Sequence, residues 1–396
     1  MTKQVNIVSA PSPTSVTKVT TLTLVIDLGT SCIKSFYTLS KRGKPRHLIY
    51  SSVVYPITNQ PEPDSTYIKL PNDRQYYLVG HSASQAKVQT SIKQLKSESL
   101  VFKVLGVIGQ IVTEESFPTR FQLKMRLLLP ISEMVDRQYI ESDLNRALKD
   151  FNYSGSDYQV DIAGMEFRPE GRGISFYLSR SISPDEIKNQ TCAYLMFGYR
   201  NTSMLLMENG QFNRVNSHST DLGFYNYLDL VAQYSSGLYR DDIQRAIVSE
   251  PSYGVDGNCK QVIKGFSSHI RVEDLIRSSN PQHQERERTS ISAAISRADE
   301  EYWQLLSRWL TEKLPPLGQL DRLVYCGGSV SFVETSIQEF FKGWQGKLIN
   351  TDRISIQMLE KLDLNPSARA KFIEQYLPVR MADAWGELVD LTNMKL

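Results

Sequence analysis

The chain has 396 residues, of which 41% are hydrophobic, and a formal net charge of +2. This is the composition of a globular protein long enough for two or more domains. A charge this close to zero does not indicate direct binding to nucleic acid or to a membrane surface. No apolar run reaches the length of a membrane span. Four widely separated cysteines and five histidines without metal-ligand spacing exclude a disulfide framework and a zinc site, and predict a cytoplasmic protein.

The N-terminal part of the chain begins with a Ser-, Thr- and Pro-rich segment, residues 1–20, which predicts a flexible tail. Two β-branched runs follow, Thr21 to Asp27 and Ile33 to Leu39, and they predict a β-hairpin whose tip is Leu28-Gly29-Thr30-Ser31. Short strands interrupted by prolines come next. A helix is then predicted over Gly80 to Lys96.

The next part of the chain alternates between strand and helix patterns. Phe121 to Leu129 predicts a strand, after which Ser132 stands where a helix N-cap is expected. Ser142 to Phe151 has a helical pattern. Val160 to Phe167 and Gly173 to Leu178 predict two further strands.

A second hairpin is predicted from Ala193 to Phe197 and from Ser203 to Glu208. Asn209-Gly210 then predicts a type I′ turn into a third strand. The order of strand, glycine-containing tip and strand around Gly29 therefore recurs around Gly198. A repeat at this separation indicates two similar lobes and not a short-period solenoid.

The longest helix is predicted from Ser290 to Leu314, where apolar residues recur at helical spacing. A short strand, Leu323 to Tyr325, then leads into Gly327-Gly328 and a helical pattern from Val333 to Phe341. Glycine at such a turn lets a ligand approach the backbone, and the helix start adds a positive dipole end. A ligand-free turn is the alternative interpretation.

The first hairpin combines the groups that a phosphate chain with Mg²⁺ needs. A tight tip at Gly29 presents several backbone N–H groups to one point, which forms an anion-binding nest. Thr30 and Ser31 add hydroxyl donors, and Lys34 adds a positive charge. Asp27 is a hard oxygen ligand that could hold magnesium through its waters. An ordinary hairpin with polar turn residues is the alternative.

The order of these features resembles the actin-like ATPase superfamily, and within it the bacterial and plasmid ParM-like actin homologues. Asp27 to Lys34 resembles the first phosphate motif, Met196 to Ser203 the second, and Tyr325 to Ser329 the adenosine motif. Ala382 to Gly386 is similar to the closing helix segment. Leu128 to Glu133 resembles a strand-to-helix turn of the ParM-like proteins.

The resemblance implies an α/β, two-lobed actin-like fold, which is a duplicated ribonuclease H-like fold, with ATP and Mg²⁺ in the cleft between the lobes. It assigns residues 21–188 and 376–396 to lobe I, in which 47–98 would form a small variable subdomain. Residues 189–375 would form lobe II, with a small subdomain at about 224–318.

The resemblance also implies roles for individual residues. Asp27 would lie beside the metal and take part in catalysis, and Glu133 would orient the attacking water. The nucleotide would be held by residues of all three motifs, namely Gly29, Thr30, Ser31, Lys34, Gly198, Tyr199, Arg200, Asn201, Thr202, Gly327, Gly328 and Ser329.

The second hairpin departs from the family pattern, because Met196 stands where the pattern begins with an aspartate. A thioether is a poor ligand for magnesium, which prefers hard oxygen atoms. Phosphoryl transfer depends on positioning and charge stabilisation, so losing one such group costs orders of magnitude in rate. We therefore expect ATP binding with weak ATPase activity, unless Glu133 or Glu170 compensates.

Three functions are compatible with these features. The leading hypothesis is a protein that forms nucleotide-dependent filaments for plasmid or DNA segregation, or for intracellular positioning, through an adaptor protein bound to DNA. A non-polymerising ATP-binding scaffold is one alternative. A small-molecule kinase of the same superfamily is the other, and it would require a catalytic aspartate that the sequence does not identify.

Overall fold

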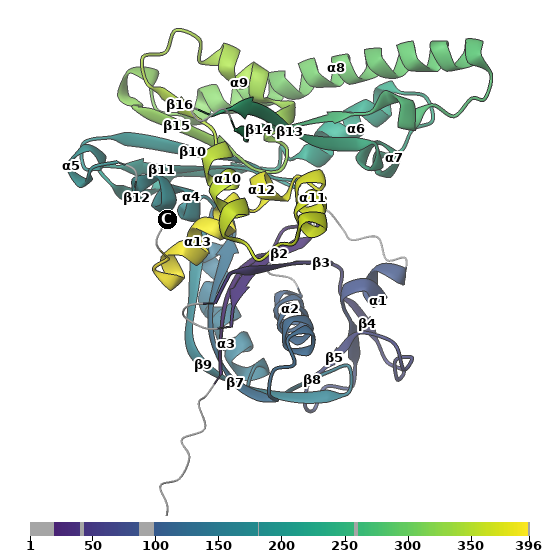
Figure 1. Cartoon of the computed structure of the whole chain (residues 1–396), viewed down its shortest axis with the longest axis vertical. Helices are drawn as coiled ribbons and strands as arrows, with labels where there is room; N and C mark the ends of the chain where they lie inside the picture. The colour runs from purple at the N-terminus through teal and green to yellow at the C-terminus, as the bar shows by residue number, and fades with distance from the viewer. Residues whose placement is uncertain (1–19, 40–42, 87–98, 181, 257–259, 395–396) are drawn as a thin grey trace, which may run out of the picture.

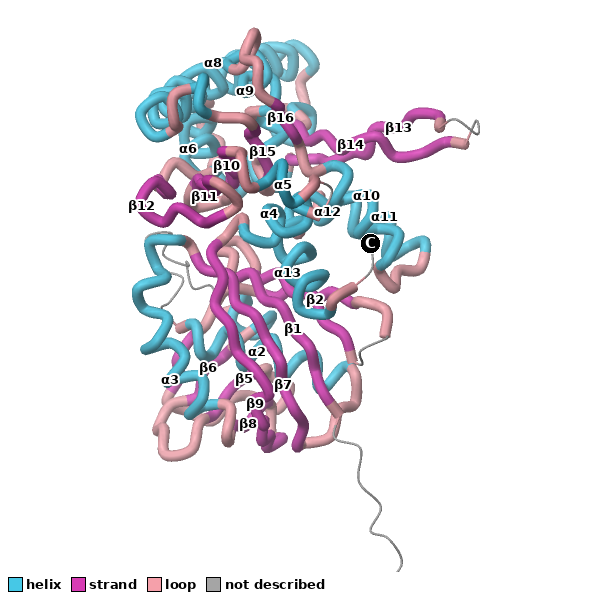
Figure 2. Tube along the Cα trace, turned by 90° about the vertical axis from the view of Figure 1, so that its left-hand side faces the viewer, coloured by secondary structure: helices cyan, strands magenta, loops and turns pink. Residues whose placement is uncertain are grey.

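The computed structural model has two lobes, each built around a β-sheet with helices packed on it (Figures 1 and 2). It describes residues 20–39, 43–86, 99–180, 182–256 and 260–394. Residues 1–19 of the predicted tail lie outside the described residues, as do residues 87–96 of the helix predicted over residues 80–96.

Lobe I contains, within the described residues, a nine-stranded sheet. Its strands, in order across the sheet, are β3 (Arg46–Tyr50), β2 (Ile33–Thr38), β1 (Thr21–Asp27), β7 (Arg120–Leu129), β9 (Ser156–Pro169), β8 (Phe151–Tyr153), β5 (Tyr67–Lys69), β6 (Tyr76–Leu78) and β4 (Tyr55–Ile57). β1 pairs antiparallel with β2 and parallel with β7, and β7 pairs parallel with β9. The predicted N-terminal hairpin is therefore confirmed.

Lobe II repeats the first part of this topology in a smaller sheet. Its strands, in order, are β12 (Gln211–Thr220), β11 (Thr202–Glu208), β10 (Thr191–Phe197), β15 (Arg322–Cys326) and β16 (Lys347–Ile349). β10 pairs antiparallel with β11 and parallel with β15, as β1 does with β2 and β7. The repeat predicted from the two glycine hairpins is confirmed by this common strand order.

The helices cover the sheets, and two of them cross at the junction between the lobes. In chain order they are α1 (Gly80–Gln85), α2 (Leu100–Glu114), α3 (Arg137–Ala147), α4 (Arg172–Ser179), α5 (Pro184–Ile187), α6 (Phe224–Tyr234), α7 (Arg240–Arg245), α8 (Pro281–Lys313), α9 (Glu334–Phe340), α10 (Asp352–Lys361), α11 (Pro366–Glu374), α12 (Leu377–Arg380) and α13 (Ala382–Thr392). Figure 1 shows α2 enclosed by the curved sheet of lobe I, and α8 along the outer side of lobe II. A search of the described helices finds none with the length and apolar character of a membrane span.

Several local predictions differ from the structure. The segment Gly173 to Leu178 forms helix α4, so its prediction as a strand is wrong. The helix predicted over Ser142 to Phe151 starts earlier, as α3, and ends at Ala147. Ser132 is not a helix N-cap, because it lies inside a 3₁₀ turn at Ile131–Asp136.

Helices α4 and α13 cross in direct contact, and two glycines permit this close approach. A Cβ atom placed on Gly173 would lie 2.0 Å from the backbone oxygen of Asp383, and one on Gly386 would lie 2.0 Å from the backbone oxygen of Gly173. No side chain fits at either position. α13 also packs on β1 and β2 of lobe I, and the start of α4 faces Tyr194 and Leu205 of lobe II. The crossing therefore forms part of the junction between the lobes.

The carboxylate of Asp383 caps the start of α4. Its two oxygens accept hydrogen bonds from the backbone N–H groups of Gly171, at 2.8 Å, and Ile174, at 3.2 Å. Burial raises the pKa of Asp383 to about 7, an effect that these backbone hydrogen bonds oppose. A cap supplied from more than 200 residues away explains why an apolar, strand-like segment adopts a helix.

Arg126, a buried residue on β7, attaches α13 to the sheet of lobe I. Its guanidinium donates to Glu387 at 2.9 Å and to Asp390 at 2.7 Å, both on α13, and to Glu166 on β9 at 2.7 Å. A buried arginine needs this degree of pairing, because an unpaired charge there would be costly. The network fixes the rotation of α13 at the junction.

A two-stranded arm projects from lobe II (Figure 2). It consists of β13 (Ile247–Val255) and β14 (Gln261–Ile270), which pair antiparallel. The base of the arm packs against α10 and α11. Towards its tip the side chains of Tyr253 and Val255 are 57% and 64% exposed. The arm thus joins the body of the molecule from its base to about the middle of its length, where Gly265, opposite Ser252, lies against Asp352 of α10.

The helix crossing predicts a strong effect of a single methyl group. We expect Gly173→Ala to lower the free energy of unfolding by about 1–3 kcal/mol, because its Cβ would overlap the backbone of Asp383. Chemical denaturation measures the change. Gly318→Ala is the matched control, since nothing lies within 4 Å of a Cβ at that position. Equal unfolding free energies for the two variants would contradict the close crossing.

The burial of Asp383 predicts a dependence of stability on pH. The folded-state pKa of Asp383, about 7, lies above its ordinary value of 3.8, so its contribution to stability is full below pH 3.8 and is lost as pH rises through 7. Asp383→Asn removes this titration. Wild type should therefore lose stability as pH rises from 3.8 to 7, and the variant should not lose it through this group. The free energy of unfolding of the variant minus that of wild type should increase over the same rise in pH. Urea denaturation across this range measures the difference, and a constant difference would show that the prediction is wrong.

Candidate functional site

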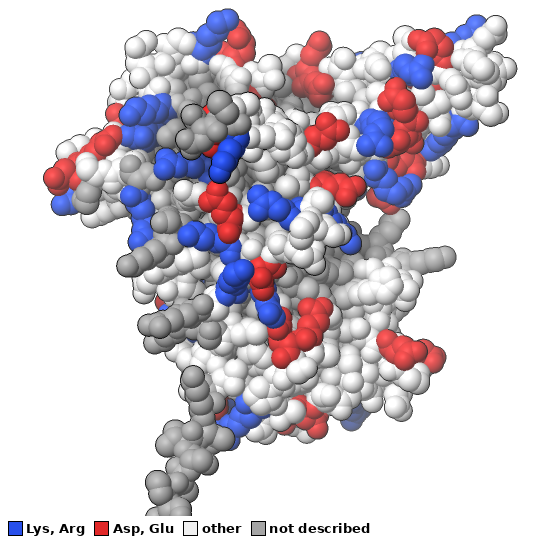
Figure 3. All heavy atoms as spheres, viewed as in Figure 1, with Lys and Arg blue, Asp and Glu red and all other residues white. Residues whose placement is uncertain are grey.

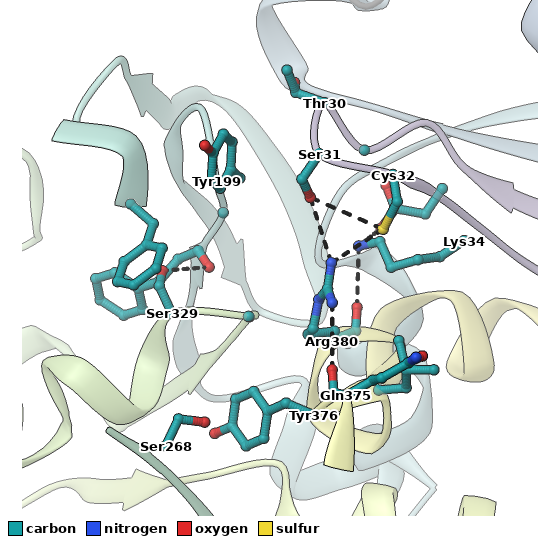
Figure 4. A pocket seen from close by; sticks show the side chains of 18 of the residues that line it. Thr30, Ser31, Cys32, Lys34, Tyr199, Ser268, Ser329, Gln375, Tyr376 and Arg380 are labelled. Atoms are coloured by element: carbon teal, nitrogen blue, oxygen red, sulfur yellow. Dashed lines mark hydrogen bonds and ion pairs between the residues drawn. The ribbon is translucent and has the colours of Figure 1, made fainter. Parts of the chain in front are cut away.

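The glycine-containing motifs predicted to act together meet at one cavity between the lobes, with a volume of about 480 Å³ (Figure 4). The predicted site residues that line it are Asp27, Gly29, Thr30, Ser31, Lys34, Gly198, Tyr199, Arg200, Asn201, Gly327, Gly328 and Ser329. Thr202 and Glu133 are not among the described residues that line it. Thr202 is buried, and its hydroxyl donates to the backbone oxygen of Leu222 at 2.6 Å.

The first hairpin pairs its acid with its base. Asp27 and Lys34 lie opposite each other on β1 and β2, and their side chains form an ion pair. The Lys34 ammonium group also donates to the backbone oxygen of Arg380 at 3.2 Å. The tip between them is tight, because a Cβ on Gly29 would lie 2.4 Å from the backbone oxygen of Cys32. The negative charge of Asp27 is therefore already balanced within the protein.

The second hairpin has a methionine at the position equivalent to Asp27. Met196 lies two residues before the tip glycine, Gly198, as Asp27 lies two residues before Gly29. Met196 pairs with Ser203 across the hairpin and lines the cavity. The site thus contains one aspartate where the repeated fold offers two equivalent positions.

The tip of the second hairpin is fixed by its neighbours. The N–H of Gly198 donates to the backbone oxygen of Asn201 at 3.0 Å, which closes the turn. The backbone oxygens of Gly198 and Tyr199 accept from Phe224 and Tyr225, at the start of α6. These hydrogen bonds fix the backbone of the tip, and they thereby set the direction in which its other polar groups face the cavity.

The third motif is attached to the second hairpin. Gly327 has a φ of 107°, and a Cβ there would lie 2.4 Å from the backbone oxygen of Phe197. The hydroxyl of Ser329 donates to the same oxygen at 3.0 Å. Only glycine fits at position 327 without strain. The turn is therefore held against the end of β10 and opens towards the cavity.

Glu133 and Arg200 form a buried ion pair between the lobes. Arg200 Nη2 lies 2.6 Å from a carboxylate oxygen of Glu133, which is only 3% exposed. Glu133 follows β7 of lobe I, whereas Arg200 belongs to the second hairpin in lobe II. Arg200 lines the cavity, and Glu133 lies behind it. Glu170, in contrast to Glu133, lines the cavity itself, as Asp27 and Glu374 do.

Arg380, at the end of α12, is a cavity residue that the sequence motifs did not identify. Its Nη2 lies 3.1 Å from the sulfur of Cys32 and 3.5 Å from the hydroxyl of Ser31 (Figure 4). Its Nη1 donates to the backbone oxygen of Gln375 at 3.4 Å. The one signal in the sequence is its position two residues before Ala382 to Gly386, the segment that resembles the closing helix.

The ionisable side chains that line the cavity are mixed in sign. The cations are Lys34, Arg200 and Arg380, and the carboxylates are Asp27, Glu170 and Glu374. The described residues contain no group of three His, Cys, Asp or Glu side chains that could hold a metal ion. The cavity can therefore accept an anion through its cations and hairpin N–H groups more readily than it can bind a bare metal ion.

The sequence matches no protein-family model and no curated protein sequence. The structure, in contrast, matches solved structures along almost its whole length. An archaeal actin homolog, Ta0583, has a TM-score of 0.55 and 14% identity over 94% of this chain and 100% of its own, and it is also known in complex with ADP.

Two filament structures give similar matches. The Alp12 filament has a TM-score of 0.52 and 18% identity over 89% of this chain and 99% of its own. The 15-stranded ParM filament from Clostridium botulinum has a TM-score of 0.54 and 12% identity over 94% of this chain and 99% of its own. Each match covers nearly all of this chain and nearly all of the solved chain, so both lobes are included. The chain therefore has the two-lobed actin-like fold.

Proposed function

We propose that this chain binds ATP in the cavity between its lobes and assembles into nucleotide-dependent filaments in the cytoplasm. The observation that carries the proposal is the meeting of the two hairpins and the Gly327-Gly328 turn at one cavity. These elements are distant in sequence and come from both lobes, so their convergence is a property of the whole fold. The ADP complex of Ta0583 supports a nucleotide as the ligand.

The lining residues suggest how the nucleotide lies. Its phosphates would contact the N–H groups of both hairpin tips, the hydroxyls of Thr30 and Ser31, and the Lys34 ammonium group. The adenosine end would lie towards the Gly327-Gly328 turn. Phe332 and Tyr376 also line the cavity and offer apolar surface to a flat base.

The donor set fits ATP better than it fits a magnesium ion held by the protein. Asp27 is in an ion pair with Lys34, and Met196 supplies a thioether at the equivalent position. Magnesium in ATP sites is bound by one or two carboxylates together with the phosphates. Any Mg²⁺ entering with ATP would therefore be held mainly by the nucleotide.

Self-association is supported by the filaments of Alp12 and of the Clostridium botulinum ParM, which share this fold. The projecting arm with exposed Tyr253 and Val255 offers apolar surface outside the body of the molecule. We propose that the filaments serve plasmid or DNA segregation, or positioning, through an adaptor. Acidic and basic side chains intermix on the face in Figure 3, a pattern that favours an adaptor over direct DNA contact.

A non-polymerising ATP-binding scaffold is the second candidate. The observation that favours it is Met196, which removes a carboxylate that hydrolysis would use. The two candidates share ATP binding and differ in assembly.

Nucleotide-dependent assembly tests the proposed function. We expect filaments in negative-stain electron microscopy, and protein in the pellet after high-speed centrifugation, with ATP but not without nucleotide. ADP should give fewer filaments, because its shorter phosphate chain makes fewer contacts across the cleft. A protein that binds ATP and stays monomeric would favour the scaffold.

A thiol assay reports ATP binding independently of assembly. Cys32 is half-buried and lines the cavity, so bound ATP should slow its alkylation by iodoacetamide. Cys192 and Cys326 are internal controls, because burial raises the pKa of both thiols. Peptide mass spectrometry separates the sites. Equal alkylation of Cys32 with and without ATP would contradict binding in this cavity.

Slow hydrolysis is the expected consequence of Met196. Loss of one group that positions charge costs about 10²–10³ in rate, so we expect steady-state phosphate release from wild type to be at least about tenfold slower than from Met196→Asp in Mg²⁺. Met196→Leu is the control and should match wild type. A wild-type turnover equal to that of Met196→Asp would show that the methionine does not limit hydrolysis.

A further inference from the structure

Arg380 differs from the other cations of the cavity in its partners. Lys34 is in an ion pair with Asp27, and Arg200 is in an ion pair with Glu133. Within the described parts of the chain, the groups that Arg380 contacts are all neutral, and none of its contacts is an ion pair. Among the cavity cations, and as far as the described residues go, its positive charge is therefore the one that an incoming anion can neutralise without first breaking a salt bridge.

The position of Arg380 places this charge between two of the motifs. Its aliphatic stem lies against the third motif, because a Cβ on Gly328 would be 3.0 Å from Arg380 Cγ. Its guanidinium points at the tip of the first hairpin, towards Ser31 and Cys32 (Figure 4). Its backbone oxygen accepts from Lys34, which fixes the end of α12 beside the phosphate hairpin. The guanidinium is thus held where the phosphate chain would cross the cavity.

The side chains at the ends of the two hairpin strands determine how well the protein could hold a magnesium ion. At the two equivalent hairpin positions, Asp27 is already paired with Lys34, and Met196 offers a thioether in place of an oxygen ligand. Glu170 and Glu374 also line the cavity, outside these two positions. The hairpin positions therefore offer one charge-balanced carboxylate and one thioether, beside a cation, Arg380, that has no acidic partner among the described residues. This set of charges favours a phosphate group directly over a phosphate–metal complex.

We propose that Arg380 binds the phosphate chain of the nucleotide and supplies the positive charge that a carboxylate-held magnesium ion would otherwise supply. A guanidinium matches phosphate oxygens with two parallel hydrogen bonds, which gives it both charge and geometry for this role. As a result, ATP binds this chain with an affinity that is nearly independent of Mg²⁺. The inference rests on the proposed binding of ATP in the cavity and adds how its charge is neutralised.

The experiment measures the affinity for a fluorescent ATP analogue, mant-ATP, in Mg²⁺ and in EDTA, at protein concentrations where light scattering shows no assembly. For wild type we expect the two dissociation constants to agree within about fivefold. In EDTA, Arg380→Gln should weaken binding by more than about fivefold, because a charge-assisted hydrogen bond is lost. Arg380→Lys should be intermediate, since it keeps the charge but not the paired donors.

Two further variants separate a binding role of Arg380 from a general loss of charge or structure. Arg146→Gln removes an exposed arginine on α3 that is ion-paired with Asp143, and it should bind as wild type does. Met196→Asp supplies the second carboxylate, and its affinity should become dependent on Mg²⁺ by more than about fivefold. Thermal unfolding of each variant checks that it is folded.

The results distinguish this inference from the proposed function. A wild-type affinity that falls by more than about fivefold in EDTA overturns the role of Arg380 as a substitute for the metal, while ATP binding stands. Unchanged affinity in folded Arg380→Gln also overturns it. Absence of mant-ATP binding in both buffers overturns the inference and the proposed function together.

Discussion

The contact between α4 and α13 is the constraint on which the arrangement of the two lobes depends. The helices can approach only because Gly173 and Gly386 have no side chains, and Asp383 then joins them by capping α4. Arg126 holds the same helix against the sheet of lobe I. A Cβ on Gly171, at the start of α4, would lie 3.4 Å from the sulfur of Met196 in lobe II. The relative position of the two hairpin tips therefore follows from this crossing.

The two hairpins share a topology but differ in charge, and this difference sets the chemistry of the cavity. In lobe I the end of the first strand carries Asp27, which Lys34 balances across the hairpin. In lobe II the same position carries Met196, and the cation of that hairpin, Arg200, is balanced by Glu133 from the opposite lobe. Each hairpin cation thus has an acidic partner before any ligand arrives. The two lobes thus share their backbone turns but differ in the side chain at the end of the first strand of each hairpin.

Predictions from sequence succeeded where the determinants are local. The strands around Gly29 and Gly198, and the glycine turn at Gly327, are specified by nearby residues, and the structure brings them to one cavity. Gly173 to Leu178 was predicted as a strand because its composition favours one, whereas the cap that makes it helical comes from Asp383. Arg380 was missed for a similar reason. Its partners, Ser31 and Cys32, are almost 350 residues away, and its place just before the closing segment does not by itself indicate a cavity residue.

The two-stranded arm has a mechanical consequence, because one end of it belongs to the cavity. Ile247, Ser249 and Ser268, at its base, line the cavity, whereas Val255 lies near its tip. The nine residues of β13 span roughly 30 Å at about 3.3 Å per residue. Were the arm to tilt as a rigid unit by roughly 5° about its cavity end, its tip would move by roughly 2.5 Å over that length. The same rotation would therefore displace the exposed tip far more than it would displace the residues that line the cavity.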